Sequence, residues 1–420
     1  MRTLLQRVAW ALAGLVLALV VARSFLGDVY RVVSVSMQPT IFGGDEVYTD
    51  EHVLVRFGGI GAPGASNALE RFDLVVFRRS PEHAPMVKRV GALPNESIGV
   101  SAGDLIVNGE RLGPDAPRPA PIPVFDDAFL DVRDFFFFDD DPDGPWSSSD
   151  GAWFVDVCDR RPGSDAGMML FHKPLRDDYL SPDHRRIVGR FEVNDAILRC
   201  EVRLEDYGGA LRFRLVEEGD TFEARVESEP DGKAYATILR YSSASLREPE
   251  NPRKRIEVVA RQELDFPLDA WHAVSFRNVD NHLSFELPGL GVELAVSYQG
   301  NEPHAGLTDV GRRSAGYRVA FGGDACRAGF RAVQVLRDLY YTSAREHGPD
   351  SPLCQYGVEE VLRLGPDEYF LLGDNSGRSN DSRVIGPVKS ERLLGRPVAV
   401  VRPLARLRWL RGALGPDEDR

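Results

Sequence analysis

The stretch AILRCEVRLEDYGGALRFRLVEEGDTFEARV, residues 196–226, decides the fold class of this chain. Apolar and polar residues alternate in three short runs within it, and acidic or glycine-rich turns separate the runs. Alternation with a period of two is typical of strands that bury one face. Similar runs recur from 184 to 345 and together predict an antiparallel β-sandwich. The nine runs are Ala196–Leu204, Ala210–Val216, Thr221–Val226, Ala234–Arg240, Arg255–Ala260, Ala273–Arg277, His282–Leu287, Val292–Val296 and Tyr317–Gly322.

The regions on both sides of this sandwich predict a mostly β chain with a second β-rich unit. Residues 28–111 contain strand-like runs between glycine-rich turns, and residues 355–402 return to strands and turns. Residues 112–183 begin with a proline-rich stretch, continue through an acidic run and lack sustained periodicity. This composition predicts a linker and irregular insertion. Residues 403–420 form a tail in which arginine is interleaved with tryptophan and leucine.

An uncharged apolar run lies near the N-terminus, at Val8–Ala22 between Arg7 and Arg23. If Arg23 reaches toward the interface, the run is long enough to cross a bilayer, and it predicts a transmembrane anchor over 1–27. A cleaved secretory signal is the alternative, because Val20-Val21-Ala22 also fits a weak cleavage site. In either case the basic N-terminus predicts that the chain after residue 27 lies outside the cytoplasm.

The composition excludes several classes of protein. With 420 residues, of which 43% are hydrophobic and 27% charged, the chain is long enough for two or three globular domains. Its net charge of -13 argues against a nucleic-acid partner. No C-x-x-C pair occurs, so neither a zinc ribbon nor a thioredoxin motif is encoded, and one or two disulfides are possible outside the cytosol. The cysteines are Cys158, Cys200, Cys326 and Cys354.

Ser36 and Lys88 are the candidate catalytic residues. Ser36 lies between a strand-like run and a proline turn, where a hydroxyl can project from a rigid edge. A serine needs a base, and the G-x-S-x-G signature that would go with a histidine is absent. Lys88 lies in an apolar strand-like run, where burial would lower the pKa of its amine and leave it neutral. A solvated lysine at a strand edge is the plain alternative, so the pair depends on further motifs.

Four motifs, ordered behind the apolar N-terminal run, resemble the conserved boxes of type I signal peptidases. The resemblance covers roughly residues 1–110 and 355–412. It implies a membrane-anchored serine endopeptidase with a Ser-Lys dyad, which removes signal peptides from exported preproteins after small residues of the Ala-x-Ala type. It implies no metal or cofactor. The motifs are SMQPT at 36–40, RFDLVVF at 71–77, VKRVGALPNE at 87–96 and GDNSGRSNDSR at 373–383.

The resemblance also implies roles for individual residues. Ser36 matches the nucleophile, Lys88 matches the general base, and Ser379 matches the serine that orients the lysine amine. Ser34 matches the serine whose hydroxyl joins the Ser36 backbone N–H in the oxyanion hole. Residues that support the site match the turn Gly373, Asp374 and Asn375 and the pair Asp381 and Arg383. Shallow pockets for substrate positions −1 and −3 match Tyr30, Val32, Val76 and Val87, whose mainly apolar walls suit small residues.

The sequence departs from the family pattern in several places. Val35 and Phe72 stand where Gly is usual, and Ser376-Gly377-Arg378 replaces a commoner Arg-Asp-Asn run. An insertion over 112–350 is far longer than a loop needs. Because none of the matched catalytic positions lies in this insertion, we expect it to fold separately and to be replaceable without loss of peptide cleavage.

The inserted sandwich resembles jelly-roll or laminin-G-like folds. It leaves open a different function, that of a surface protein that binds a glycan or protein partner through the sandwich and carries a degenerate peptidase core. Self-cleaving repressor proteases use a related Ser-Lys fold, but the apolar N-terminal run and the lack of a basic recognition helix argue against that class.

Two further segments allow two interpretations each. The acidic run from Asp139 to Asp150 has the oxygen-rich spacing of a calcium loop, but its prolines favour a solvated acidic loop. The tail at 403–420 predicts either contact with anionic lipid headgroups or a closing strand with solvated arginines.

Overall fold

The computed structural model describes most of the chain between its two ends. No helix in the described part is long and apolar enough to cross a membrane. The predicted anchor at 1–27 lies outside the described residues apart from Gly27. The described residues are 27–57, 68–101, 103–113, 116–139, 141, 143–160, 165–217, 220–230, 232–241, 256–299, 317–342, 354–358 and 360–412.

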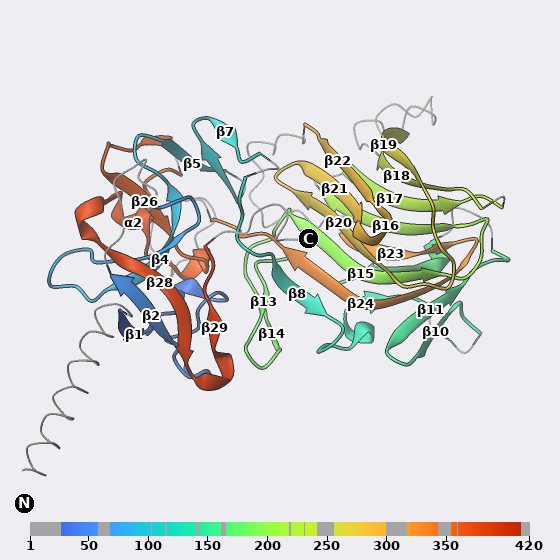
Figure 1. Cartoon of the computed structure of the whole chain (residues 1–420), viewed down its shortest axis with the longest axis horizontal. Coiled ribbons are helices and arrows are strands. Elements are labelled where there is room, and N and C mark those ends of the chain that lie inside the picture. Colours follow the sequence, from blue (N-terminus) through green and yellow to red (C-terminus); the bar gives the residue numbers. More distant parts are fainter. Residues whose placement is uncertain are drawn as a thin grey trace, which may run out of the picture.

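Two β-rich bodies lie side by side (Figure 1). One body combines residues from both sides of the insertion, and we call it the split body. The other body is built from the middle of the chain and is the sandwich. Strands pair antiparallel in both. The prediction of a mostly β chain is therefore confirmed.

The main sheet of the split body needs both halves of the sequence. Strand β28 lies between β2 and β3, and β26 pairs with β4, so the segment after the insertion completes the sheet that the segment before it begins. The sheet order is β1 (Asp28–Arg31), β2 (His52–Phe57), β28 (Leu393–Arg402), β3 (Leu74–Phe77), β4 (Met86–Ala92), β26 (Glu368–Leu372) and β27 (Val388–Lys389), with β29 (Arg408–Trp409) paired to β28. A smaller sheet has the order β25 (Leu362–Arg363), β5 (Ser97–Ser101), β6 (Asp104–Val107) and β7 (Glu110–Arg111).

The sandwich consists of two sheets that bury their apolar faces against each other. One sheet has the order β10 (Trp146–Ser149), β11 (Ala152–Asp156), β24 (Arg327–Arg337), β15 (Ala196–Leu204), β20 (His272–Val279), β21 (His282–Leu287) and β22 (Val292–Ser297), with β8 (Ile122–Asp126) paired to β24. The other has the order β19 (Ile256–Leu264), β18 (Ala234–Tyr241), β17 (Asp220–Ser228), β16 (Ala210–Glu217), β23 (Val319–Asp324), β12 (Met168–Phe171) and β9 (Phe136–Phe137).

The alternation in the sequence explains this core. Each of the nine predicted runs coincides with a strand, from β15 to β23, and β16 and β17 direct Phe213 and Phe222 into the core. The burial of these apolar rows drives the two sheets together. The long strand β24, which the nine runs did not include, lies between β11 and β15.

The prediction that 112–183 is irregular is wrong. This segment supplies β8, β9, β10, β11 and β12 to the two sandwich sheets. Its aromatic residues pack together instead of alternating with polar ones: Phe125 contacts Phe135, Phe136 and Phe171 at ring distances of 5.0, 5.2 and 6.4 Å. The sandwich therefore begins near residue 122 and not at 184.

The insertion leaves and re-enters the split body at one place. Ile122 on β8 and Arg337 on β24 are paired across antiparallel strands. A hairpin formed by β13 (Tyr179–Leu180) and β14 (Arg186–Ile187) belongs to neither sandwich sheet and lies between the two bodies (Figure 1). The four cysteines are free thiols, so the structure contains none of the disulfides that the sequence left open.

Candidate active site

The predicted nucleophile lies in a short turn after β1. Ser36 is the middle residue of the 3-10 turn η1 (Val35–Met37) and is 5% exposed. Ser34 precedes the turn in an extended conformation, and its Oγ accepts a hydrogen bond from the Ser36 backbone N–H at 3.3 Å. Capping of this kind satisfies a backbone donor at the start of a helical turn. The turn therefore holds the Ser36 side chain in place beside the main sheet.

Strand β4 carries Lys88 to this serine. Lys88 is 3% exposed, and its Nζ lies 2.5 Å from Ser36 Oγ in a hydrogen bond. The structure thus brings together two residues that are 52 positions apart in the sequence. An amine this close to a serine hydroxyl is within reach of its proton.

Burial makes the Lys88 amine a usable base. Removal from water lowers the pKa of Lys88 from 10.5 to about 8. Asp381 and Asp374 act in the opposite direction and raise the pKa, whereas Arg383 lowers it. A substantial fraction of the amine is therefore neutral near pH 8 and can accept a proton.

The turn at 373–375 supports the nucleophile from below. The backbone N–H of Asn375 donates to the carbonyl oxygen of Ser36 at 3.1 Å, and Asn375 Nδ2 donates to Val35 O at 3.1 Å. Gly373 lies close to Ser379 and to the carbonyl oxygen of Ser36. A Cβ at position 373 would stand 2.1 Å from Ser379 Oγ and 2.6 Å from Ser36 O. Glycine is therefore required here by space.

A buried ion pair joins Asp381 and Arg383. Arg383 Nε and Nη2 donate to the two oxygens of the Asp381 carboxylate at 2.9 and 2.8 Å, and both side chains are fully buried. Asp381 also accepts the backbone N–H of Gly373 at 2.9 Å. Burial alone would raise the pKa of Asp381, but Arg383 and these donors hold it below its ordinary value. The pair stays charged and fixes the turn beneath Ser36.

A second buried ion pair was missed in the sequence. Arg89 Nε and Nη2 donate to the two oxygens of Asp374 at 2.8 and 2.7 Å, and Arg89 is 2% exposed. Arg89 follows Lys88 directly, and successive residues of a strand point to opposite faces. The adjacent Lys-Arg in the motif was the available signal: one residue serves the dyad and the other fixes the turn.

The two remaining predicted serines are placed differently from expectation. In the described structure Ser379 is buried, and no hydrogen bond joins its Oγ to Lys88. The hydroxyl instead faces Gly373 and lies close enough to Asp381 to help lower the pKa of that carboxyl. The Ser34 hydroxyl was expected to donate beside the Ser36 backbone N–H in the oxyanion hole. In the structure it accepts a hydrogen bond from that N–H instead.

The predicted pocket residues form one apolar cluster beside the nucleophile. Val76 on β3 is paired with Val87 on β4, and both belong to a cluster that includes Met37, the neighbour of Ser36. Val32 and Val76 are buried, whereas Tyr30 and Val87 are partly exposed. The partly exposed pair forms the accessible edge of the cluster.

The departures from the family pattern have structural reasons in two places. Phe72, which stands where Gly is usual, has a φ of 67°, a left-handed conformation that glycine adopts without strain. It is also 4% exposed, so its ring fills part of the core. At Gly377 a Cβ would lie 2.6 Å from Cε2 of Phe191, a residue of the insertion.

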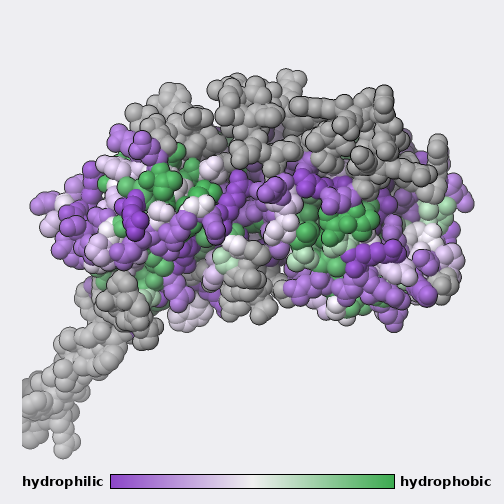
Figure 2. All heavy atoms as spheres, turned by 90° about the horizontal axis from the view of Figure 1, so that it is seen from above, coloured by the Kyte–Doolittle hydropathy of each residue, from purple (hydrophilic) through white to green (hydrophobic). Residues whose placement is uncertain are grey.

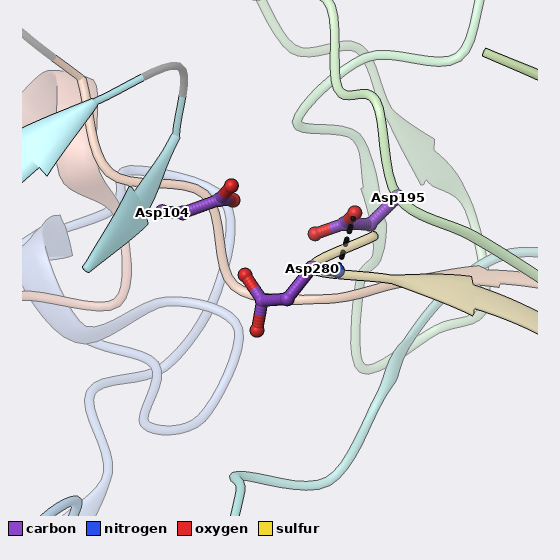
Figure 3. Close-up of side chains that lie close together, drawn as sticks. All are labelled: Asp104, Asp195 and Asp280. Atoms are coloured by element: carbon purple, nitrogen blue, oxygen red, sulfur yellow. Dashed lines mark hydrogen bonds between the residues drawn. The ribbon is translucent and has the colours of Figure 1, made fainter. Parts of the chain in front are cut away.

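A cluster of three aspartates lies where the two bodies meet. Figure 3 shows Asp104 of the split body facing Asp195 and Asp280 of the sandwich, and their oxygens lie within 4.8 Å of one another. Asp280 is also paired with Arg118, and Asp104 lies 3.3 Å from Arg111. Burial and the neighbouring carboxylates raise the pKa of Asp104 and of Asp195 well above their ordinary values. Among the described residues these three carboxylates are the set close enough together to hold a metal ion, and the acidic run at Asp139–Asp150, which the sequence left open as a calcium loop, contributes no such set.

Comparison with known proteins bears on the split body. A family model described as "Signal peptidase, peptidase S26" matches residues 5–122 and 338–402. The signal peptidase I V of Bacillus subtilis (strain 168) is 36% identical over 106 residues, which are 24% of this chain and 56% of that protein. The segments on both sides of the insertion thus match the signal peptidase family, peptidase S26. The matched residues build the split body, and the sandwich is built almost entirely from the residues between the two matched segments.

Other similarities are more limited. The signal peptidase I P of Bacillus subtilis subsp. natto is 30% identical over 89 residues, 21% of this chain and 43% of that protein. The chain thus spans about half the length of the curated signal peptidases it matches. Among solved structures, the carbohydrate-binding module CBM66 from Bacillus subtilis covers 46% of this chain and 92% of that chain, with 11% identity and a TM-score of 0.27. A likeness at that level supports no inference about a ligand.

Proposed function

We propose that this chain is a serine endopeptidase that removes N-terminal signal peptides from exported preproteins. The observation that carries the proposal is the buried contact between Lys88 Nζ and Ser36 Oγ, together with a lysine pKa near 8. A serine beside a neutral buried amine is an activated nucleophile. This contact also argues against a degenerate peptidase core.

The proposed reaction has two covalent steps. The neutral Lys88 amine takes the Ser36 proton while Ser36 Oγ bonds to the substrate carbonyl carbon, and the oxyanion is held by the Ser36 N–H and the Ser34 hydroxyl once that hydroxyl turns from acceptor to donor. The protonated amine then donates to the leaving nitrogen as the peptide bond breaks. Water, deprotonated by Lys88, attacks the acyl-enzyme and releases Ser36.

We assign substrate binding to the apolar cluster of Tyr30, Val32, Val76 and Val87. Its three valines leave room for small residues and offer no partner to a charge, in line with cleavage after Ala-x-Ala.

We also assign the split body to a membrane surface, with the predicted anchor at 1–27 in the bilayer. Figure 2 shows apolar patches that interrupt the polar surface of the molecule. The described tail keeps Leu404, Leu407 and Trp409 exposed at 79%, 65% and 76%, beside several arginines. Exposed apolar side chains flanked by arginine suit an anionic lipid surface.

The test is preprotein cleavage by membranes that contain the full chain, its Ser36→Ala variant or its Lys88→Ala variant. We expect processing by the wild type and none by either variant, and the double variant should be no worse than the single ones because the two residues act as a unit. Substantial turnover by Lys88→Ala would overturn the assignment of the base. Binding of preprotein without cleavage by the wild type would overturn the proposed activity.

A further inference from the structure

The hairpin of the insertion lies against the loop that carries the nucleophile. Its strands β13 and β14 pair only with each other among the described strands, and Figure 1 places the hairpin between the two bodies. The hydroxyl of Tyr179 on β13 donates to Gln38 Oε1 at 2.7 Å. Gln38 is two residues beyond Ser36 and closes the turn η1, with its backbone N–H on Val35 O at 3.1 Å.

Both partners of this hydrogen bond are buried. Gln38 is 1% exposed and Tyr179 is 8% exposed. Gln38 Oε1 accepts from the Tyr179 hydroxyl, and Gln38 Nε2 is buried without an acceptor. Among the described residues, the Tyr179 hydroxyl is therefore the one hydrogen-bond partner of the Gln38 side-chain amide. The orientation of the amide, and with it the packing at the end of the nucleophile turn, therefore depends on this hydroxyl.

The hairpin that carries Tyr179 is fixed to the sandwich. Arg337, the last residue of β24, donates to the carbonyl oxygens of Asp178 at 2.8 Å and Asp177 at 3.1 Å. The carboxylate of Asp178 is buried and accepts from Arg186 Nε on β14 at 2.9 Å. These contacts fix the position of Tyr179. Hydrogen bonds therefore connect β24 to the hairpin and the hairpin to the nucleophile turn.

The turn at Gly377 also lies against the insertion. Phe191, which follows the hairpin, occupies the space that a side chain at position 377 would need. Gly377 belongs to the run in which this chain departs from the signal peptidase pattern. A small polar cavity lies between these contacts, lined by Gln38, Asp374 and Ser376 on one side and by Asp177 and Tyr179 on the other.

We propose that Tyr179 is a positioning residue for Ser36, so that the inserted hairpin is a working part of the peptidase site. This inference rests on the proposed function. Tyr179 acts through Gln38 and belongs to a different apolar cluster from the residues assigned to substrate binding, so the loss of its hydroxyl should lower kcat and leave KM unchanged. One hydrogen bond that orients a nucleophile corresponds to a rate loss of about three- to tenfold.

The experiment compares full-length variants with a minimal Ala-x-Ala peptide. Tyr179→Phe removes the hydroxyl and keeps the ring, and Gln38→Leu removes the acceptor. Tyr298→Phe is the matched control, because Tyr298 donates to Glu217 and Asn278 inside the sandwich, away from the site. We expect a lower kcat at constant KM for Tyr179→Phe and for Gln38→Leu, no greater loss in the double variant, and wild-type kcat for Tyr298→Phe.

Three results would overturn the inference. A wild-type kcat in Tyr179→Phe would show that the hydroxyl does not position the nucleophile. Equal losses in Tyr179→Phe and Tyr298→Phe, with lowered Tm in both, would show a general loss of stability. Additive losses in the double variant would show that the two residues act separately. A wild-type protein that fails to cleave, by contrast, would overturn the proposed function itself.

Discussion

At the scale of single residues, burial decides what Lys88 can do. A lysine in water is protonated at neutral pH and cannot accept the proton of Ser36. The apolar run around Lys88 allowed its burial to be predicted, because such a run in a strand faces a core. The sequence around Lys88 could not show which groups oppose this effect. Asp374 and Asp381 lie nearly 300 residues away along the chain and limit how far the pKa of Lys88 falls.

The pH dependence of cleavage follows from this amine. Since only the neutral form accepts a proton, kcat/KM should rise with pH and level off above an apparent pKa of about 8, below the ordinary value of 10.5. Steady-state cleavage of a minimal peptide between pH 6 and 10 measures the profile. Lys389→Met, which removes an exposed lysine on β27, should leave it unchanged. A rate that keeps rising up to pH 10 would mean that Lys88 is solvated.

Gly373 gives a second test at the residue scale. A methyl group there would collide with Ser379 Oγ and with the carbonyl oxygen of Ser36, so Gly373→Ala should displace the nucleophile and lower kcat by about a hundredfold. Gly113→Ala is the control, because a Cβ at Gly113 has no neighbour within 4 Å. Kinetics on both variants decide the matter, and near-normal turnover by Gly373→Ala would show that the turn can shift without harm.

At the scale of elements, the tail is partly a structural strand. Strand β29 pairs with β28, and Arg408 donates through Nη1 and Nη2 to the two oxygens of Glu51 at 2.8 Å each. The Glu51 side chain is fully buried. The two interpretations of the tail therefore apply to different residues: arginines turn inward to a carboxylate, while Leu407 and Trp409 remain exposed.

The Arg408 pair predicts a measurable loss of stability. Arg408→Met should lower the free energy of unfolding by about 2 kcal/mol, because the buried Glu51 would lose two of its hydrogen bonds and keep the longer contact with Arg406, at 3.4 Å. Partial exposure of Arg408 moderates the effect. Urea titration of the full chain measures it. Arg402→Met, on an exposed position of β28, should change it by less than about 0.5 kcal/mol. Equal stability of the two variants would refute a structural role for β29.

The elements that could be predicted are those with a clear period. Strands such as β15, β16 and β22 alternate apolar and polar residues because one face of each is buried, and the nine predicted runs coincide with all the strands from β15 to β23. Strands β8 to β12 were missed because each has only two to five residues, and because Phe125 of β8 and Phe136 of β9 pack against each other instead of alternating with polar residues. The hairpin of Tyr179–Leu180 and Arg186–Ile187 has strands of two residues each, too short for any period to appear.

At the scale of the whole molecule, the motifs located the Ser36–Lys88 contact but not the contacts between the insertion and the nucleophile turn. Tyr179 and Gln38 are 141 residues apart, and no local pattern encodes their contact. The same holds for Thr342, at the end of the insertion, whose carbonyl and hydroxyl oxygens both accept from Arg383 Nη1 at 2.9 Å. The expectation that 112–350 could be replaced without loss of cleavage rested on matched positions alone, and these contacts lead us to predict the opposite.

Two deletions separate the roles of the insertion. Replacement of 112–350 by a Gly/Ser linker removes Thr342, which leaves the buried Arg383 without two acceptors, and it removes Tyr341 from the core of the split body. We expect this variant to be inactive and unstable, because orphaned buried donors cost about 1–3 kcal/mol each, and more for a charged group.

The shorter deletion keeps those residues. Ile122 and Arg337 are paired across adjacent strands, so a turn of a few glycines and serines can join 122 to 337. This variant should fold with a cooperative thermal transition and cleave the minimal peptide more slowly than the wild type, since it lacks Tyr179 and Phe191. Circular dichroism and peptide kinetics on both variants give the answer. Full activity after removal of 112–350 would show that the split body completes its site alone, and that the contacts with the hairpin are packing without consequence for catalysis.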